Sequence, residues 1–340
     1  MKKIEMKPST VRMLLPNLAS LFPNGSSIWT PKSVREVRLK HIQERKQKTS
    51  QQMPKIIVSR MAKGGVGKTT VVGNLGSVLA MMGYKVLLVD GDPQASLTGL
   101  MGIDWTKNDL VHIGHLIRNC YQRQNLRLEE TIEHIYPDGN LDLIPADITL
   151  VETDSWMMGA VNREQLFVRL LSENIAFFSR YEVIIVDTAP ATSLLTNALM
   201  LATREILAVA MLDGSSVKAM QVLSSNIAEI NSAFPGLNMG IHIVANGYHG
   251  SYKSCSESLQ AIATSYPGQA NDTVLPWSAA FRRQISPLAD GTSGTVLERE
   301  PQSDSAAAMA ELARSLIERY GILLDGQFIS LLTIDAEVAV

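Results

Sequence analysis

The strongest constraint on the fold is a glycine-rich segment, MAKGGVGKTT at residues 61–70, which lies between two different hydrophobic patterns. It follows KIIVS, a short β-branched run of the kind that forms buried strands. It precedes residues 68–82, where apolar side chains recur at helical spacing until Gly83 supplies a C-terminal stop. A strand, a glycine loop and a helix in this order predict an α/β unit with a tight turn where the strand ends.

Further hydrophobic runs repeat this arrangement downstream. Short apolar runs without polar alternation are typical of strands that are covered on both faces, and the spacing leaves room for a helix between most of them. We therefore predict an α/β fold with a doubly wound, mostly parallel β-sheet flanked by helices, as in P-loop NTPases. The predicted strands are residues 55–60, 85–90, 141–146, 182–187, 205–212, 239–246 and a shorter run, DTVLPW, at 272–277.

The first 54 residues lie outside this pattern and are basic. Residues 1–60 carry a net charge of +10, whereas the remainder carries −12. Residues 30–48 predict one helix with Thr30 as its cap, Pro31 in the first turn and positive charge nearly all the way round. We expect a basic N-terminal arm over residues 1–54, one α/β domain over 55–325 and a tail over 326–340. The arm is either a solvated basic segment or a contact surface for nucleic acid or another acidic partner.

Composition argues against several classes of protein. The two cysteines, Cys120 and Cys255, are far apart and lack ligand-like spacing, which argues against a disulfide framework, a zinc site or an iron–sulfur cluster. The N-terminus has the charges of a signal peptide but no apolar stretch after them. The longest apolar-rich segment, residues 193–212, is interrupted by Arg204 and Glu205 at its middle. We therefore expect a cytoplasmic protein without a membrane span.

The glycine loop has the composition of a phosphate-binding loop. Glycines let successive main-chain N–H groups point at phosphate oxygens, and the following helix presents its positive end to them. Lys68 is then expected to reach the β and γ phosphates, and the Thr69 hydroxyl to ligate Mg²⁺. A turn that merely links strand to helix would not require Lys-Thr at this place. The predicted nucleotide-binding residues are Lys63, Gly64, Gly65, Val66, Gly67, Lys68, Thr69 and Thr70.

The loop departs from the common pattern GxxxxGK[ST], because Ala62 replaces the first glycine and Lys63 follows it. KGGVGKTT resembles the deviant Walker A motif of the ParA/MinD family of ATPases, and the resemblance extends over about residues 54–320. It implies a protein that binds and hydrolyses ATP. It also implies that Lys63 reaches across a dimer interface to the nucleotide held by the other subunit, so that this lysine serves association and catalysis together.

Three later motifs occur in the order that the resemblance implies. VLLVDGDPQ, at residues 86–94, places Asp92 where the family aspartate orients or activates the attacking water. EVIIVDT, at residues 182–188, provides Asp187 as a Mg²⁺ ligand acting through a water, and residues 188–197 are expected to move with nucleotide state. Asn246 stands where the family often has an adenine-contacting asparagine, and an ordinary turn asparagine is the alternative.

The residues that would determine whether the protein binds DNA or a membrane lie near the C-terminus. Residues 274–294 resemble the segment with which ParA-type proteins bind DNA without sequence preference, and Arg282 and Arg283 are the expected contacts. The alternative is a pair of exposed arginines on a helix. MinD-like proteins attach to membranes through a basic amphipathic helix at the C-terminus, whereas no Lys or Arg follows Arg319 here. We therefore expect no membrane partner.

Together these features resemble a DNA partition ATPase. The resemblance implies an ATP-sandwich homodimer that binds non-specific DNA on the nucleoid and is released by hydrolysis, which a ParB-like centromere-binding protein stimulates. Two alternatives stay open. One is a family ATPase that positions a protein machine without binding DNA, and the other is an autorepressor acting through residues 1–54.

Overall fold

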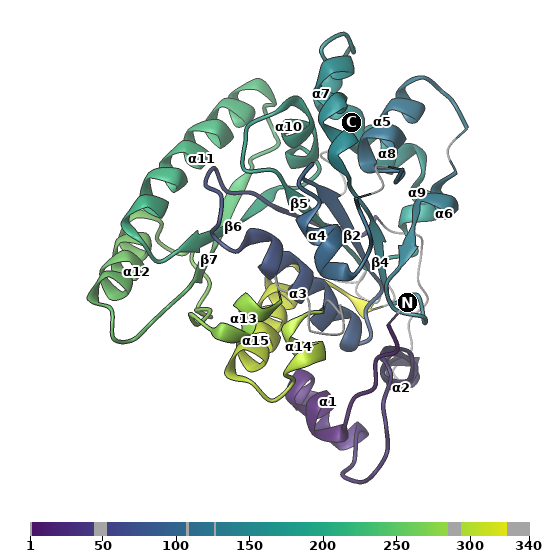
Figure 1. Ribbon diagram of the computed structural model, residues 1–340, viewed down its shortest axis with the longest axis vertical. Helices are drawn as coiled ribbons and strands as arrows, with labels where there is room; N and C mark the ends of the chain where they lie inside the picture. The colour runs from purple at the N-terminus through teal and green to yellow at the C-terminus, as the bar shows by residue number, and fades with distance from the viewer. Residues whose placement is uncertain (1, 44–52, 107–108, 126, 285–293, 325–340) are drawn as a thin grey trace.

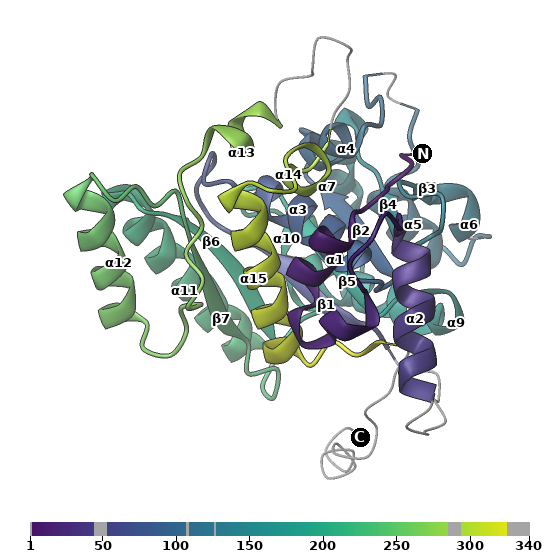
Figure 2. The ribbon, with the colours of Figure 1, turned by 90° about the horizontal axis from the view of Figure 1, so that it is seen from below.

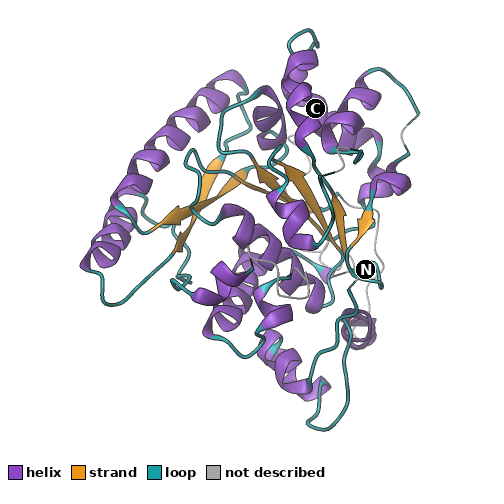
Figure 3. Cartoon of the chain, viewed as in Figure 1, coloured by secondary structure: helices purple, strands orange, loops and turns teal. Residues whose placement is uncertain are grey.

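The computed structural model describes residues 2–43, 53–106, 109–125, 127–284 and 294–324. Helices surround a central β-sheet (Figures 1 and 3). The described residues form seven strands in the order β3-β4-β2-β5-β1-β6-β7. All neighbours are parallel except β3, which runs antiparallel to β4 at one edge. This confirms the predicted α/β class with a mostly parallel sheet. The strands are β1 (Lys55–Ser59), β2 (Val86–Gly91), β3 (Glu133–His134), β4 (Leu141–Ile144), β5 (Val183–Thr188), β6 (Glu205–Met211) and β7 (Gly240–Asn246).

Helices cover both faces of the sheet (Figure 1). On one face, α3 (Lys68–Met81) packs between the strands and α15 (Asp304–Tyr320). The opposite face carries α8 (Leu166–Glu173), α10 (Leu194–Met200) and α11 (Gly214–Ala233). None of the helices in the described residues has the length and hydrophobicity that a bilayer crossing requires. The other helices of the domain are α4 (Ser96–Met101), α5 (Ile113–Tyr121), α6 (Leu128–Thr131), α7 (Glu152–Met157), α9 (Ile175–Phe178), α12 (Lys253–Ser265), α13 (Ala279–Arg283) and α14 (Val296–Arg299), with 3₁₀ turns η2 (Ile148–Val151) and η3 (Arg163–Gln165).

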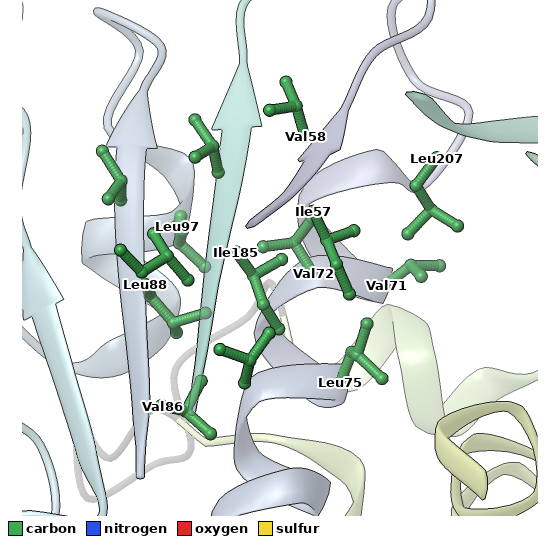
Figure 4. Close-up of a cluster of buried hydrophobic side chains, with 14 of the residues drawn as sticks. Ile57, Val58, Val71, Val72, Leu75, Val86, Leu88, Leu97, Ile185 and Leu207 are labelled. Carbon is green, nitrogen blue, oxygen red and sulfur yellow. The ribbon is translucent and has the colours of Figure 1, made fainter. Parts of the chain in front are cut away.

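The first crossover helix, α3, is buried along almost its whole length. Figure 4 shows Val71, Val72 and Leu75 of α3 beside Ile57 of β1 and Ile185 of β5, and all five side chains are at most 1% exposed. Burying a side chain of this size contributes about 1.5–3 kcal/mol to folding. Since α3 begins where the glycine loop ends, this packing holds the loop at the carboxyl edge of β1.

One predicted strand is absent. Residues 272–277 form no strand, and in this region only isolated bridges at Ala270 and Pro276 are present. The segment still follows β7, because the Leu275 N–H donates to the Ala245 carbonyl at 2.9 Å and the Tyr248 N–H donates to the Leu275 carbonyl at 3.0 Å. The Trp277 N–H also donates to the Tyr248 carbonyl at 2.8 Å, so Pro276 pairs with Tyr248, but this bridge is isolated and no continuous ladder forms. The strand prediction was therefore wrong, although the segment lies beside the sheet.

The described part of the N-terminal arm packs onto the domain. It consists of α1 (Pro8–Leu14), η1 (Pro16–Leu21) and α2 (Pro31–Gln43). Leu14 and Phe22 are fully buried in the same core as the sheet. Figures 1 and 2 show α1 beside α15, where Arg314 Nη1 donates to the Met13 carbonyl at 2.9 Å. This part of the arm is therefore not a freely solvated segment.

Helix α2 begins as predicted. The Ser33 N–H donates to Thr30 Oγ1 at 3.2 Å, which confirms Thr30 as the cap. Val34 and Arg38 are buried, and Arg35 donates to Glu182 with two hydrogen bonds of 2.7 and 3.0 Å. Positive charge therefore lies even on the side of the helix that faces the domain, where Arg35 and Arg38 are used in contacts with it. Residues 44–48 of the expected helix lie outside the described residues.

Because the N-terminal arm packs on the domain, a substitution in the arm should lower the stability of the whole protein. We expect Leu14→Ala to lower the free energy of unfolding by about 2–5 kcal/mol, because it opens a cavity between α1 and the core. Ser9→Ala, at an exposed position of the same helix, should change it by less than about 0.5 kcal/mol. Urea denaturation measures both. Equal, small effects would show that the arm is not part of the cooperative core.

Candidate nucleotide site

The glycine loop connects the end of β1 to the start of α3. Gly65 and Gly67 have φ values of 74° and 88°, in the left-handed region that favours glycine. Among the described residues, no main-chain N–H group from Gly64 to Thr69 donates to a main-chain carbonyl. These N–H groups are therefore available as donors, as a phosphate cradle at a helix N-terminus requires.

Lys68, Thr69 and Asp187 meet at one buried carboxylate. Lys68 Nζ lies 2.5 Å from Asp187 Oδ1, and Thr69 Oγ1 donates to Asp187 Oδ2 at 2.5 Å. The Lys68 side chain is 7% exposed and the Asp187 side chain is completely buried. The register of β1 and β5 places Ser59 opposite Asp187, so the loop after β1 and the end of β5 lie at the same edge. The structure thus brings Asp187 to Lys68 and Thr69, which lie more than a hundred positions earlier in the sequence.

Asp90 lies near the end of β2 and Asp92 directly follows this strand, at the same carboxyl edge of the sheet. Asp90 lies level with Asp187, and burial, together with the charge of Asp187, raises the pKa of Asp90 to about 7. The Asp90 carboxylate accepts hydrogen bonds from the N–H and hydroxyl of Thr98 at 2.9 and 2.8 Å. Asp92 is 8% exposed, and its Oδ1 accepts the Gln94 N–H at 2.9 Å. Asp90 therefore anchors α4, while Asp92 borders open space beside the loop.

That space is a cavity of about 820 Å³, within the usual range for small-molecule sites. A smaller hollow of about 230 Å³ lies on the other side of the loop. Gly65, Gly67 and Thr70 line both, so together they accommodate an elongated ligand that crosses the loop. The larger cavity is also lined by Lys63, Gly64, Val66, Lys68, Thr69, Asp92, Gln94, Pro190 and Gln284, and the smaller one by Asn246, Gly247, Pro276, Trp277 and Arg282.

Asn246 contacts the loop directly. Its Nδ2 donates to the Val66 carbonyl at 2.8 Å, and the side chain is 8% exposed at the end of β7. This bond fixes the main chain of the loop beside the smaller hollow. Asn246 is thus more than a turn residue, and its contact with adenine remains a prediction.

Lys63 has partners within its own chain. Its Nζ lies 2.5 Å from Asp213 Oδ2 and 2.6 Å from Ser215 Oγ. Partial burial alone would raise the pKa of Asp213, but hydrogen bonds from Lys63 and Ser216 lower it to about 2. Asp213 was not predicted from the sequence, although it lies two residues after β6, whose neighbour β1 leads into the loop. The contact of Lys63 with a second subunit remains a prediction.

The two arginines on α13 are engaged with neighbouring side chains. The Arg282 guanidinium lies 4.4 Å from the centre of the Trp277 ring, a cation–π distance. Arg283, with 54% of its side chain exposed, forms an ion pair of 2.6 Å with Glu300. Arg282 lines the smaller hollow, whereas Arg283 contacts Glu300 instead. Their predicted role in DNA binding remains a prediction.

Comparison with known proteins identifies the family. Residues 54–243 match a protein-family model described as an AAA domain. A ParA family protein of Chlamydia trachomatis is 30% identical over 227 residues, which cover 64% of this chain and 82% of that protein. The chain belongs to the ParA family of P-loop ATPases. This confirms the family and the ATPase class that the loop predicted.

Another relative and a solved structure cover more of the chain. The chromosome-partitioning ATPase Soj of Treponema pallidum is 26% identical over 278 residues, covering 79% of this chain and 99% of Soj. The structure of McdA from Cyanothece in complex with ATP shares the fold, with a TM-score of 0.64 and 18% identity over 78% of this chain and 96% of that one. The ParA-family fold therefore extends well beyond the loop itself.

The packing of Asn246 against the loop predicts the effect of filling Gly67. A Cβ on Gly67 would lie 2.4 Å from Asn246 Nδ2, at a φ that costs other residues about 1–2 kcal/mol. We expect Gly67→Ala to weaken nucleotide binding about tenfold or more, because the loop must shift. Titration with a fluorescent nucleotide measures this. Gly64→Ala, whose Cβ would meet no atom within 4 Å, should keep the parental melting temperature. Parental nucleotide affinity in Gly67→Ala would contradict the assigned loop geometry.

Proposed function

We propose that this ParA-family chain is a cytoplasmic, Mg²⁺-dependent partition ATPase, whose ATP-bound homodimer binds DNA without sequence preference and releases it after hydrolysis. The observation that carries the proposal is the meeting of Lys68 and Thr69 at Asp187, beside a loop with available N–H groups. Soj, which aligns with most of this chain, is a chromosome-partitioning ATPase, and that relationship supports partition as the cellular role.

The donor set fits a nucleotide with Mg²⁺. Hydroxyl and carboxylate oxygens are the ligands that Mg²⁺ prefers, and Thr69 and Asp187 provide them at one point. The loop N–H groups and Lys68 would hold the phosphates, and Asn246 lies on the side of the smaller hollow, where the base would bind. When bound, Mg²⁺ neutralises charge on the phosphate oxygens.

Asp92 and Lys63 would control turnover. The Asp92 carboxylate is kept in place by the Gln94 N–H and borders the cavity, so it can orient a water toward the terminal phosphate. Lys63 must leave Asp213 and Ser215 to reach the nucleotide of a second subunit. Because hydrogen bonds hold the pKa of Asp213 at about 2, its carboxylate stays ionised throughout the physiological pH range. Dimerisation would thus exchange an internal ion pair for a contact between subunits.

DNA binding is assigned to Arg282 and Arg283. Both side chains are exposed on α13, and a homodimer would double their number. Arginines that neutralise backbone phosphates give salt-sensitive binding without sequence preference. In this proposal the protein associates with the nucleoid, and a ParB-like centromere-binding protein stimulates hydrolysis.

The contacts of these arginines favour a second candidate function. The ion pair with Glu300 offsets the charge of Arg283, and stacking on Trp277 occupies one face of the Arg282 guanidinium, so in this conformation neither arginine is free of protein contacts. A ParA-family ATPase that positions a protein machine without binding DNA would use the same nucleotide site and would not need these side chains.

Two substitutions test the nucleotide roles. Asp92→Ala should reduce ATP turnover about a hundredfold or more while nucleotide affinity is kept, since it removes the group that orients the water. Lys68→Ala should abolish nucleotide binding, since it removes the charge that faces the phosphates. Phosphate release and nucleotide titration measure these effects. Parental turnover in Asp92→Ala would show that the catalytic assignment is wrong.

Binding to random-sequence duplex DNA distinguishes the two functions. With a slowly hydrolysed ATP analogue we expect binding that weakens as salt increases, and with ADP we expect none. The double variant Arg282→Ala/Arg283→Ala should lose it. A control variant, Arg127→Ala/Arg180→Ala, removes two exposed arginines elsewhere and should retain it. No DNA binding in any nucleotide state would favour the positioning function.

A further inference from the structure

Arg60 is a buried arginine between β1 and the glycine loop. Its side chain is the largest among those that the described residues bury completely, and the residue is 2% exposed. Burial lowers the pKa of Arg60 to about 10, and no carboxylate in the described part of the chain forms a salt bridge with it. A buried charge without a counter-charge is costly, so its retention calls for a specific role.

The hydrogen bonds of Arg60 connect two functional segments. Nη1 donates to the Met61 carbonyl at 2.7 Å and to the Pro190 carbonyl at 2.7 Å, and Nη2 donates to Thr192 Oγ1 at 3.2 Å. Met61 begins the glycine loop, whereas Pro190 and Thr192 belong to residues 188–193, which follow Asp187. Pro190 also lines the large cavity. One guanidinium therefore holds the start of the loop and the segment after Asp187 together.

The segment that Arg60 holds leads directly into α10. Ser193 caps this helix by accepting the Thr196 N–H at 3.0 Å. Asp154 of α7 accepts the N–H groups of Leu194 and Leu195 at 3.3 and 3.0 Å. A shift of residues 190–192 would thus displace the start of α10 and its contact with α7. Arg60 lies between the nucleotide cavity and these two outer helices.

We infer that Arg60 is a positioning residue, which makes the conformation of residues 188–193 depend on the state of the glycine loop and thereby sets the rate of turnover. The inference rests on the nucleotide-binding function proposed for the loop. Neither the loop at Met61 nor the segment at Pro190 can move independently without breaking a charge-assisted hydrogen bond to the Arg60 guanidinium, whose residue is 2% exposed. Leaving a charged donor without its acceptor costs free energy, so the glycine loop and residues 188–193 move together.

Arg38 provides a matched control within the same protein. It is also buried, at 8% exposure, and its guanidinium donates to the Met82 carbonyl and to the Tyr84 hydroxyl. These contacts join α2 to the far end of α3 and touch neither the glycine loop nor residues 188–193. Arg38→Met therefore removes a comparable buried guanidinium without affecting the proposed connection.

The experiment compares Arg60→Met, Arg60→Lys and Arg38→Met in the full chain. Hydrogen exchange of peptides covering residues 188–200 is measured without nucleotide, with ADP and with a slowly hydrolysed ATP analogue, alongside kcat, KM and melting temperature. In Arg60→Met we expect exchange at residues 188–193 to be about tenfold faster and equal in all nucleotide states. Its kcat should fall about tenfold or more, while KM changes less than about twofold.

The controls separate a positioning role from a purely structural one. Arg60→Lys should restore part of kcat, because an ammonium can donate to a carbonyl oxygen but cannot form the guanidinium fork. Arg38→Met should lower the melting temperature and leave exchange at residues 188–193 and kcat at parental values. The inference is wrong if Arg60→Met keeps the parental exchange and kcat, or if Arg38→Met changes both as strongly. If the parental protein fails to hydrolyse ATP, the proposed function is contradicted instead, and exchange without nucleotide still decides whether Arg60 holds the segment.

Discussion

The parallel pairing of β1 with β5 is the constraint on which the nucleotide site depends. It places Ser59 level with Asp187, so the glycine loop and the buried carboxylate emerge side by side. The Thr188 hydroxyl reinforces this by donating to the Ser59 carbonyl at 2.8 Å. Burial of α3 beneath the same two strands then fixes the direction of the loop. Hydrophobic packing of α3 against the sheet thus positions the nucleotide-site residues at the carboxyl edge of the strands.

The site contains buried charges that would not be favourable in an ordinary core. Lys68 is paired with Asp187, Asp90 has a raised pKa, and Arg60 has only neutral acceptors. Removing ions from water is expensive, and pairing recovers only part of the cost. The surrounding apolar core supplies the stability that makes this arrangement possible. In the proposed function, these charges serve a phosphate ligand and the segment that follows Asp187.

The described part of the N-terminal arm extends this core rather than forming a separate unit. Leu14 and Phe22 enter it, while Arg35 forms hydrogen bonds with Glu182 immediately before β5. Lys2 forms an ion pair of 3.1 Å with Glu298 of α14. Some of the basic residues of this segment therefore attach it to an acidic domain. A contact with nucleic acid would have to use the outward-facing charges that remain.

The sequence by itself determined the class of fold and the nucleotide loop, because both depend on local patterns. Six of the predicted strands and α3 follow from hydrophobic patterns, and the glycines mark the turn. The sequence did not show the two-residue β3, which is too short for any periodicity. The strand prediction also failed at residues 272–277, where a run of strand composition forms only isolated bridges.

The tertiary structure decided which distant residues meet, because partners such as Asp213 for Lys63, or Pro190 and Thr192 for Arg60, depend on strand order and crossover path. It also decided that α1 and α2 pack on the domain. The apolar side chains of α2 are interspersed with lysines and arginines in the sequence, and the burial of both helices depends on the surface that α3 offers to both and α15 offers to α1. Local sequence patterns specify the helices and strands, whereas long-range burial and hydrogen bonding specify the nucleotide site.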